Sequence, residues 1–142
     1  MLAVGRKAYA IGDADAVRAA LLEDWGRAGD ITAQATLSPE IGARAVIAAR
    51  RPGRLSGLDL AAAAFRLSDP SIEVERLARD GDRLEPGDVV MRVSGPARGM
   101  LSAERVALNY LGHLSGVATA TAAFADRIAH TKARIVCTRK TT

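Results

Sequence analysis

Cysteine, histidine and aromatic residues are scarce in this chain of 142 residues. The single cysteine, Cys137, excludes an internal disulfide, and one cysteine with two histidines is too few for a zinc site built from these ligands. Aromatic residues make up only 4% of the chain, so the core has to be built mainly from alanine, leucine, valine and isoleucine. The low cysteine content favours a reducing compartment.

Long apolar runs are also missing. Residues 1–13 lack the apolar centre of a signal peptide, and no stretch approaches the roughly 20 apolar residues of a membrane span. We therefore expect a cytoplasmic protein. The net charge is +4, but the arginines are scattered among acids and few aromatic residues accompany them. This pattern argues against nucleic-acid binding.

Helical and extended patterns alternate along the chain. Apolar spacing predicts helices over residues 14–24, 58–67 and 103–129, the last one capped by Ser102 and broken at Ser115 and Gly116. Short apolar or alternating runs predict strands over residues 42–51, 72–78, 89–93 and 132–137. The order of these elements predicts an α/β domain in the first hundred residues, with an antiparallel sheet of about four strands.

The last predicted strand, at residues 132–137, has only five residues after it. A strand that follows such a helix normally joins a parallel sheet built from further strand–helix units. The strand either joins the earlier sheet in antiparallel fashion or belongs to a longer protein. We expect the second, so that the chain is a piece of something larger.

Arg105 is the first candidate binding residue. It lies in the first turn of the predicted helix over residues 103–129, where the helix dipole favours acids over cations. An anion held jointly by the guanidinium and the free N–H groups of the helix would offset this cost. The alternative is that Arg105 points outward or pairs with a nearby acid.

A second candidate is the polar segment of Thr138, Arg139, Lys140 and Thr141. It follows the predicted strand at residues 132–137, and the C-terminal ends of parallel strands carry the ligand groups of many α/β enzymes. Its cations and hydroxyls suit phosphate or carboxylate and supply no base or nucleophile. The alternative is a frayed polar tail.

Acids near residue 24 suggest metal ligands at first sight. Glu23, Asp24 and Asp30 are close in the sequence. Residues 29–32 fit a capped turn equally well, however, and we assign no metal to these acids.

Several motifs occur together in one order. EDWGRAGDIT at residues 23–32 is similar to the signature EDxGxGDxT, and ERVALN at 104–109 with LSGVAT at 114–119 is similar to ERxALNxLxxLSGIAT. TRKT ends the series at residues 138–141, after glycine turns at residues 80–88. Together these segments resemble the quinolinate phosphoribosyltransferases over essentially the whole chain.

The resemblance implies a reaction. Members of this family transfer a phosphoribosyl group from phosphoribosyl pyrophosphate to quinolinate with decarboxylation, giving nicotinate mononucleotide, pyrophosphate and CO2 in NAD biosynthesis. They use Mg²⁺, whose ligands we expect outside this chain. Because family members are considerably longer, we expect this chain alone to be inactive.

The resemblance also implies an architecture. Residues 1–115 are expected to form an N-terminal α/β domain with a hammerhead-like antiparallel sheet, and residues 116–142 to begin a truncated α/β barrel. Subunits are expected to pair head to tail in a homodimer or higher oligomer. Arg105 then reaches quinolinate in the neighbouring site, while Thr138, Arg139 and Lys140 bind substrate in their own barrel.

Two alternatives remain. A pyrophosphorylase-like paralogue associated with molybdenum transport shares the TRKT region, although the form of EDWGRAGDIT favours the quinolinate enzyme. A non-catalytic biotinyl or lipoyl carrier is suggested by the turns and strands of residues 80–95. Such carriers need a lysine in an exposed hairpin turn, and no lysine lies between Arg54 and Gly99.

Overall fold

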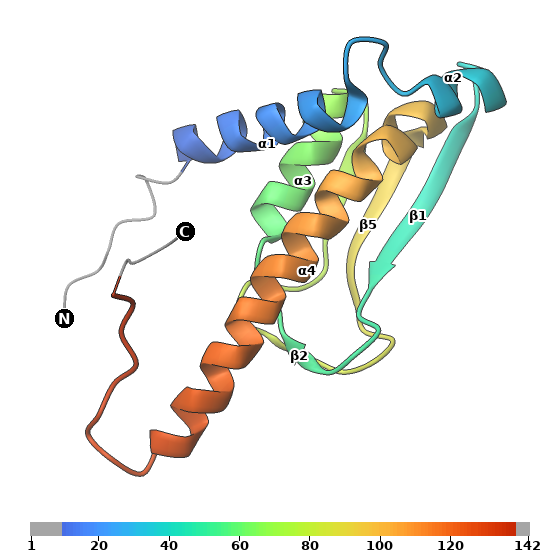
Figure 1. Cartoon of the computed structure of the whole chain (residues 1–142). Helices are drawn as coiled ribbons and strands as arrows, with labels where there is room; N and C mark the ends of the chain where they lie inside the picture. Colours follow the sequence, from blue (N-terminus) through green and yellow to red (C-terminus); the bar gives the residue numbers. More distant parts are fainter. Residues whose placement is uncertain (1–9, 139–142) are drawn as a thin grey trace.

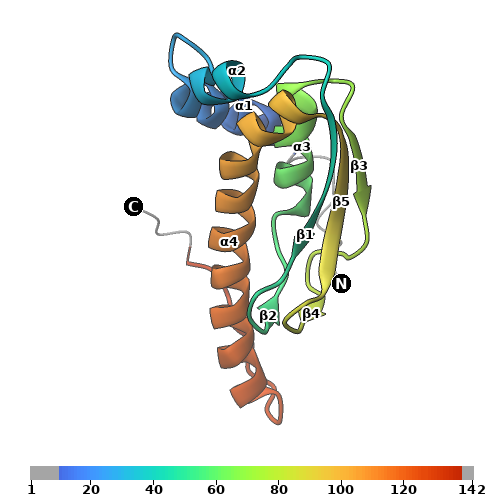
Figure 2. The ribbon, with the colours of Figure 1, turned by 90° about the vertical axis from the view of Figure 1, so that its right-hand side faces the viewer.

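The fold has a layer of helices packed on a layer of strands. The computed structural model describes residues 10–138 and places the helices on one face of a three-stranded sheet (Figure 2). The helices are α1 (Ala10–Trp25), α2 (Ile31–Thr36), α3 (Leu58–Ser68) and α4 (Ala97–Ile128). The strands are β1 (Gly42–Ala48), β2 (Gly53–Arg54), β3 (Glu73–Arg76), β4 (Arg83–Leu84) and β5 (Val89–Pro96).

The three-stranded sheet is antiparallel throughout. β5 lies in the middle, and its Val93 is opposite Ala45 of β1 on one side and Val74 of β3 on the other. β2 and β4 form a separate two-stranded antiparallel ladder. The predicted antiparallel pairing is confirmed, but the sheet has three strands and not about four, and the fold is of the mixed α+β kind. Because β5 pairs on both sides, residues 80–95 are built into the domain and do not form a separate carrier module.

Small side chains bring α3 and α4 together over the sheet. Ala61 and Ala64 of α3 and Ala103 and Ala107 of α4 are completely buried. Met91 of β5, also completely buried, belongs to the same core. Because few large aromatic side chains are available, the core is filled by small side chains that allow the helices to pack closely together.

α4 begins earlier than the sequence pattern predicts and runs as one continuous helix (Figure 1). Pro96 has a φ of −58°, which suits the start of a helix. Gly99 permits close packing, because a Cβ there would lie 2.8 Å from Cβ of Asp69. The predicted cap at Ser102 and the predicted break at Ser115 are therefore wrong.

Neither α4 nor any other helix within residues 10–138 is long and apolar enough to cross a membrane.

Residues 132–137 do not form the predicted strand. They follow α4 as an exposed, irregular segment that pairs with no strand in the part of the chain that the structure describes. A strand needs a neighbour for its backbone N–H and C=O groups, and residues 10–138 supply none beside this segment. The expectation that the segment stays out of the antiparallel sheet is confirmed.

Candidate functional site

An open cleft of about 790 Å³ lies between the loop that joins α1 to α2 and the first half of α4. One wall consists of residues 24–32. The other consists of Leu101, Glu104, Arg105, Leu108 and Asn109 of α4. The segments EDWGRAGDIT and ERVALN, which are far apart in the sequence, therefore line the same cleft.

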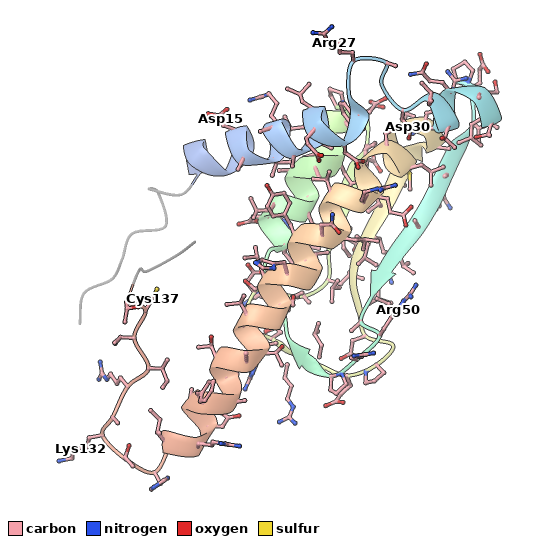
Figure 3. The ribbon with its side chains drawn as sticks, in the orientation of Figure 1. Asp15, Arg27, Asp30, Arg50, Lys132 and Cys137 are labelled. Carbon is pink, nitrogen blue, oxygen red and sulfur yellow. The ribbon has the colours of Figure 1, made fainter. Side chains whose placement is uncertain are left out.

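Two glycines allow the α1–α2 loop to turn sharply. Gly26 has a φ of +58° and Gly29 a φ of +72°, a region that favours glycine. A Cβ on Gly29 would also lie 3.0 Å from the side-chain nitrogen of Gln34. Figure 3 shows Arg27, which lies between the two glycines, at the outer part of this loop. The glycines of the motif thus have a backbone role in shaping the cleft.

One polar contact caps α2, and two more fix the loop on α4. Asp30 is the N-cap of α2, and its Oδ1 accepts a hydrogen bond of 2.9 Å from the backbone N–H of Ala33. Its Oδ2 accepts a bond of 2.8 Å from the hydroxyl of Ser102. The indole Nε1 of Trp25 donates to the carbonyl oxygen of Ser102 at 2.8 Å. Ser102, in the second turn of α4, therefore anchors the loop, and the predicted capped turn at residues 29–32 is confirmed.

The surroundings of Asp30 favour its ionised form. The hydrogen bond from the Ala33 backbone lowers the pKa of Asp30 below 3.8, and the bond from Ser102 lowers it further. Partial burial acts in the opposite direction, and the charge of Arg105 makes a smaller lowering contribution to the pKa. Asp30 is thus an anionic structural residue of the cleft wall, unsuited to act as a general acid near neutral pH.

Arg105 pairs with an acid on α1. Its Nε lies 3.2 Å from Oδ1 of Asp24, and the side chains are 76% and 23% exposed respectively. Because α4 starts at Ala97, Arg105 lies in the third turn of the helix, and the prediction that it lies in the first turn is wrong. The alternative of pairing with a nearby acid is the arrangement observed. The ion pair engages Nε, and the guanidinium has further N–H donors at its terminal nitrogens.

Sequence reasoning did not identify the partners that organise this cleft. The sequence presents Asp24 as a possible metal ligand and as part of the EDWGRAGDIT motif, and it predicts no binding partner for Trp25. One signal was present: Asp24 lies at the C-terminal end of its helix, where the dipole disfavours an acid. A cation near this carboxylate was therefore to be expected, although the sequence does not say which one.

The second group of predicted site residues lies elsewhere. Thr138 is exposed in the irregular segment after α4, and residues 129–138 line no part of the cleft. Figure 3 likewise shows Cys137 well away from Asp30. Arg139 and Lys140 lie outside the described residues. Within one chain, the structure therefore does not bring Arg105 and Thr138 together.

The acids of the cleft do not fit a Mg²⁺ site. No group of three or more His, Cys, Asp or Glu able to hold a metal occurs within residues 10–138. Both carboxylate oxygens of Asp30 already accept hydrogen bonds, and Asp24 is paired with Arg105. A magnesium ion requires several free oxygen ligands. We derive no chemical step through a metal from these residues.

The chain matches a family model described as the N-terminal domain of quinolinate phosphoribosyl transferase, over residues 30–115. It is 42% identical over 125 residues to a chloroplastic nicotinate-nucleotide pyrophosphorylase of Oryza sativa, covering 88% of this chain and 33% of that protein. It is 39% identical over 129 residues to the corresponding protein of Mycobacterium leprae, covering 89% of this chain and 45% of that protein.

Solved structures show the same fold. NadC from Streptococcus pyogenes matches with a TM-score of 0.85 and 37% identity, covering 90% of this chain and 45% of that one. A nicotinate-nucleotide pyrophosphorylase from Ehrlichia chaffeensis matches with a TM-score of 0.83 and 32% identity, covering 90% and 46%. The chain thus spans about a third to a half of the length of the relatives that it matches.

Proposed function

The chain belongs to the quinolinate phosphoribosyltransferase family, and we propose that it takes part in phosphoribosyl transfer to quinolinate with loss of CO2. The observation that carries this proposal is the position of Arg105. It lies in the segment that matches the family model, in a cleft lined by two motifs of the family, and most of its side chain is exposed. The products are nicotinate mononucleotide and pyrophosphate, as part of NAD biosynthesis.

The chemistry of the substrates supports this role for Arg105. Quinolinate carries two carboxylates, and phosphoribosyl pyrophosphate carries a phosphate and a pyrophosphate group. A site for them requires cations that orient both substrates and stabilise charge while the ribosyl carbon becomes oxocarbenium-like. The guanidinium of Arg105 binds one carboxylate of quinolinate as pyrophosphate leaves. No nucleophilic side chain is needed.

The separation of Arg105 from the TRKT segment supports a site shared between subunits. α4 alone places Arg105 and the end of the helix about 35 Å apart along its axis. In the proposed homodimer or higher oligomer, Arg105 of one subunit faces Thr138, Arg139 and Lys140 of another. These last residues bind substrate phosphate or carboxylate. The Mg²⁺ that the family uses is held by residues beyond those described.

A cytoplasmic location completes the proposal. It rests on the low cysteine content of the chain, which favours a reducing compartment. Relatives are found in several compartments, since those of Oryza sativa and Nicotiana tabacum include chloroplastic and mitochondrial forms. Fractionation of cells that express the chain with its own N-terminus tests this part.

An exchange of segments tests the proposed function. The matched 129-residue segment of the Mycobacterium leprae protein is replaced by the corresponding residues of this chain. We expect the exchanged protein to form nicotinate mononucleotide, measured by chromatography, only when quinolinate and phosphoribosyl pyrophosphate are both present. The 142-residue chain alone is the comparison, and we expect it to be inactive. An exchanged protein that folds and assembles but forms no product contradicts the proposal.

A further inference from the structure

The C-terminal end of α1 carries an acid in an electrostatically unfavourable place. Asp24 is next to the last residue of the helix, and the last turn contains no basic residue. The negative end of the helix dipole raises the energy of a carboxylate at this position. Arg105 on α4 supplies the missing cation at 3.2 Å.

The contact between α1 and α4 fixes how these two side chains meet. Trp25, directly after Asp24, donates its indole N–H to the carbonyl oxygen of Ser102. Ser102 and Arg105 are three residues apart in α4 and therefore lie on the same face of the helix. The neighbouring pairs Trp25–Ser102 and Asp24–Arg105 thus form one junction, which sets the position of α1 along α4.

The geometry of the pair leaves donors of Arg105 available. Asp24 engages Nε, whereas four of the five N–H donors of a guanidinium lie on its terminal nitrogens. The Arg105 side chain is 76% exposed and lines the cleft. An arginine held at Nε loses less freedom when its terminal nitrogens bind a planar carboxylate, because its long side chain is already partly ordered.

We propose that Asp24 is a positioning residue, which holds Arg105 by its Nε so that the terminal nitrogens bind a carboxylate of quinolinate. This inference rests on the proposed function. The Arg105 side chain of the pair is 76% exposed, and ion pairs with an exposed partner contribute little to stability. The main effect of the ion pair is therefore to orient the guanidinium of Arg105, and Asp24 of the EDWGRAGDIT segment has this role.

Quinolinate titrations of the exchanged protein test the inference, because that protein contains the rest of the proposed site. Equilibrium dialysis with labelled quinolinate measures the dissociation constant, and the NMR signal of the Arg105 Nε–H reports the ion pair. We expect Asp24→Ala to raise the dissociation constant for quinolinate about 2- to 12-fold, the penalty for ordering one long side chain. Asp24→Asn is expected to recover only part of this loss, because its amide oxygen occupies the same place beside Nε but carries no charge.

A matched control and a double variant separate positioning from general damage. Asp15 lies on the same helix and pairs with Arg18 at 3.0 Å, away from the cleft lining, so Asp15→Ala is expected to leave quinolinate binding unchanged. If Asp24 acts through Arg105, Asp24→Ala adds nothing to the loss caused by Arg105→Ala. Additive losses in the double variant overturn the inference, and so does an Asp24→Ala chain that binds quinolinate as tightly as wild type.

The two proposals fail in different ways. If Arg105→Ala weakens quinolinate binding and Asp24→Ala does not, the inference about Asp24 is wrong and the proposed function stands. If wild type shows no quinolinate binding, or if Arg105→Ala binds like wild type, the proposed role of Arg105 is contradicted, and the role of Asp24 falls with it.

Discussion

Asp30 shows how much of the cleft depends on one side chain. Its two oxygens serve different elements, since one caps α2 and the other accepts the hydroxyl of Ser102 on α4. Arg98, also on α4, donates to the carbonyl oxygens of Gln34 and Leu37 at the other end of α2. α2 is therefore held on α4 at both ends, and the wall of the cleft is fixed by side chains from a single helix.

Replacement of Asp30 is expected to loosen this wall. Asp30→Ala removes the cap of α2 and should lower the free energy of unfolding by about 0.5–2 kcal/mol. Asp30→Asn keeps an acceptor and should cost less. Urea unfolding at pH 7, followed by circular dichroism, measures both effects. An Asp30→Ala chain as stable as wild type would show that the cap contributes nothing.

Because the pKa of Asp30 is lowered in the folded state, its contribution to the free energy of unfolding depends on pH. Hydrogen bonds from the Ala33 backbone and Ser102 hold the pKa of Asp30 in the folded state below the value of an unfolded aspartate, which is about 3.9. The ionised carboxylate therefore stabilises the fold above about pH 4, and this contribution is lost as the pH falls through the lower folded pKa. The stability difference between wild type and Asp30→Asn should shrink from pH 5 to pH 2. A stability difference between the two proteins that stays constant from pH 5 to pH 2 would show that the ionisation of Asp30 is not coupled to folding.

Single residues were predictable from the sequence only where the relevant interaction is local. The capped turn at Asp30 was recognised because its partner is three residues away. The ion pair between Asp24 and Arg105 joins residues on two different helices, so no local pattern reveals it. Arg105 lies outside the first turn of α4 for a related reason, since the helix begins at Ala97 and its early residue Gly99 packs against the distant Asp69.

At the scale of elements, hydroxyls of α4 hold β2 and the loop that joins it to α3. Thr119 Oγ1 accepts a hydrogen bond of 2.8 Å from the backbone N–H of Arg54. Ser115 Oγ accepts from the N–H of Ser56 at 3.0 Å and donates to its carbonyl oxygen. The LSGVAT segment therefore has a structural function. The hydroxyls of Ser115 and Thr119 supply hydrogen-bond partners for backbone groups of Arg54 and Ser56.

A pair of threonine variants tests this function. Thr119→Val removes the acceptor of a half-buried backbone N–H and should lower the free energy of unfolding by about 1–2 kcal/mol. Thr121, two residues further on, bonds only to the carbonyl oxygen of Val117 within its own helix and is exposed. Thr121→Val should therefore stay within about 0.5 kcal/mol of wild type. Equal effects of the two variants would contradict the assignment.

Elements with a clear period were predicted well, and those that depend on partners were not. α3 and the strands β1, β3 and β5 lie where apolar spacing places them, with shifts at their ends. β2 and β4 have only two residues each and exist because they pair with one another. Residues 132–137 have a strand-like sequence but no neighbouring strand within residues 10–138, and they stay irregular. A strand-like pattern shows that a segment is able to pair in a sheet, but the segment becomes a strand only where a neighbouring strand is available.

At the scale of the whole molecule, exposed apolar residues on α4 predict self-association. Leu101 and Leu108 in the cleft are 51% and 42% exposed, and Phe124 further along is 60% exposed. Sedimentation velocity should therefore give a mass of at least twice 14.9 kDa for the chain at micromolar concentration. Leu108→Glu should weaken association about tenfold or more, because a charge would enter the interface. Leu77→Glu, at an exposed residue outside α4 and the cleft lining, is the matched control. A monomer at all concentrations would contradict this predicted self-association.

The affinity of the Arg105→Ala variant for quinolinate tests the central claim most directly. In the exchanged protein, loss of a charge-assisted bond to a carboxylate should raise the quinolinate KM about 10- to 150-fold. The KM for phosphoribosyl pyrophosphate should change less. Arg105→Lys should recover only part of the loss, because a point charge does not reproduce the guanidinium fork. Arg18→Ala, which removes an arginine outside the cleft lining, is the control. If Arg105→Ala folds, assembles and uses quinolinate like wild type, Arg105 is an ordinary surface residue and the account is wrong.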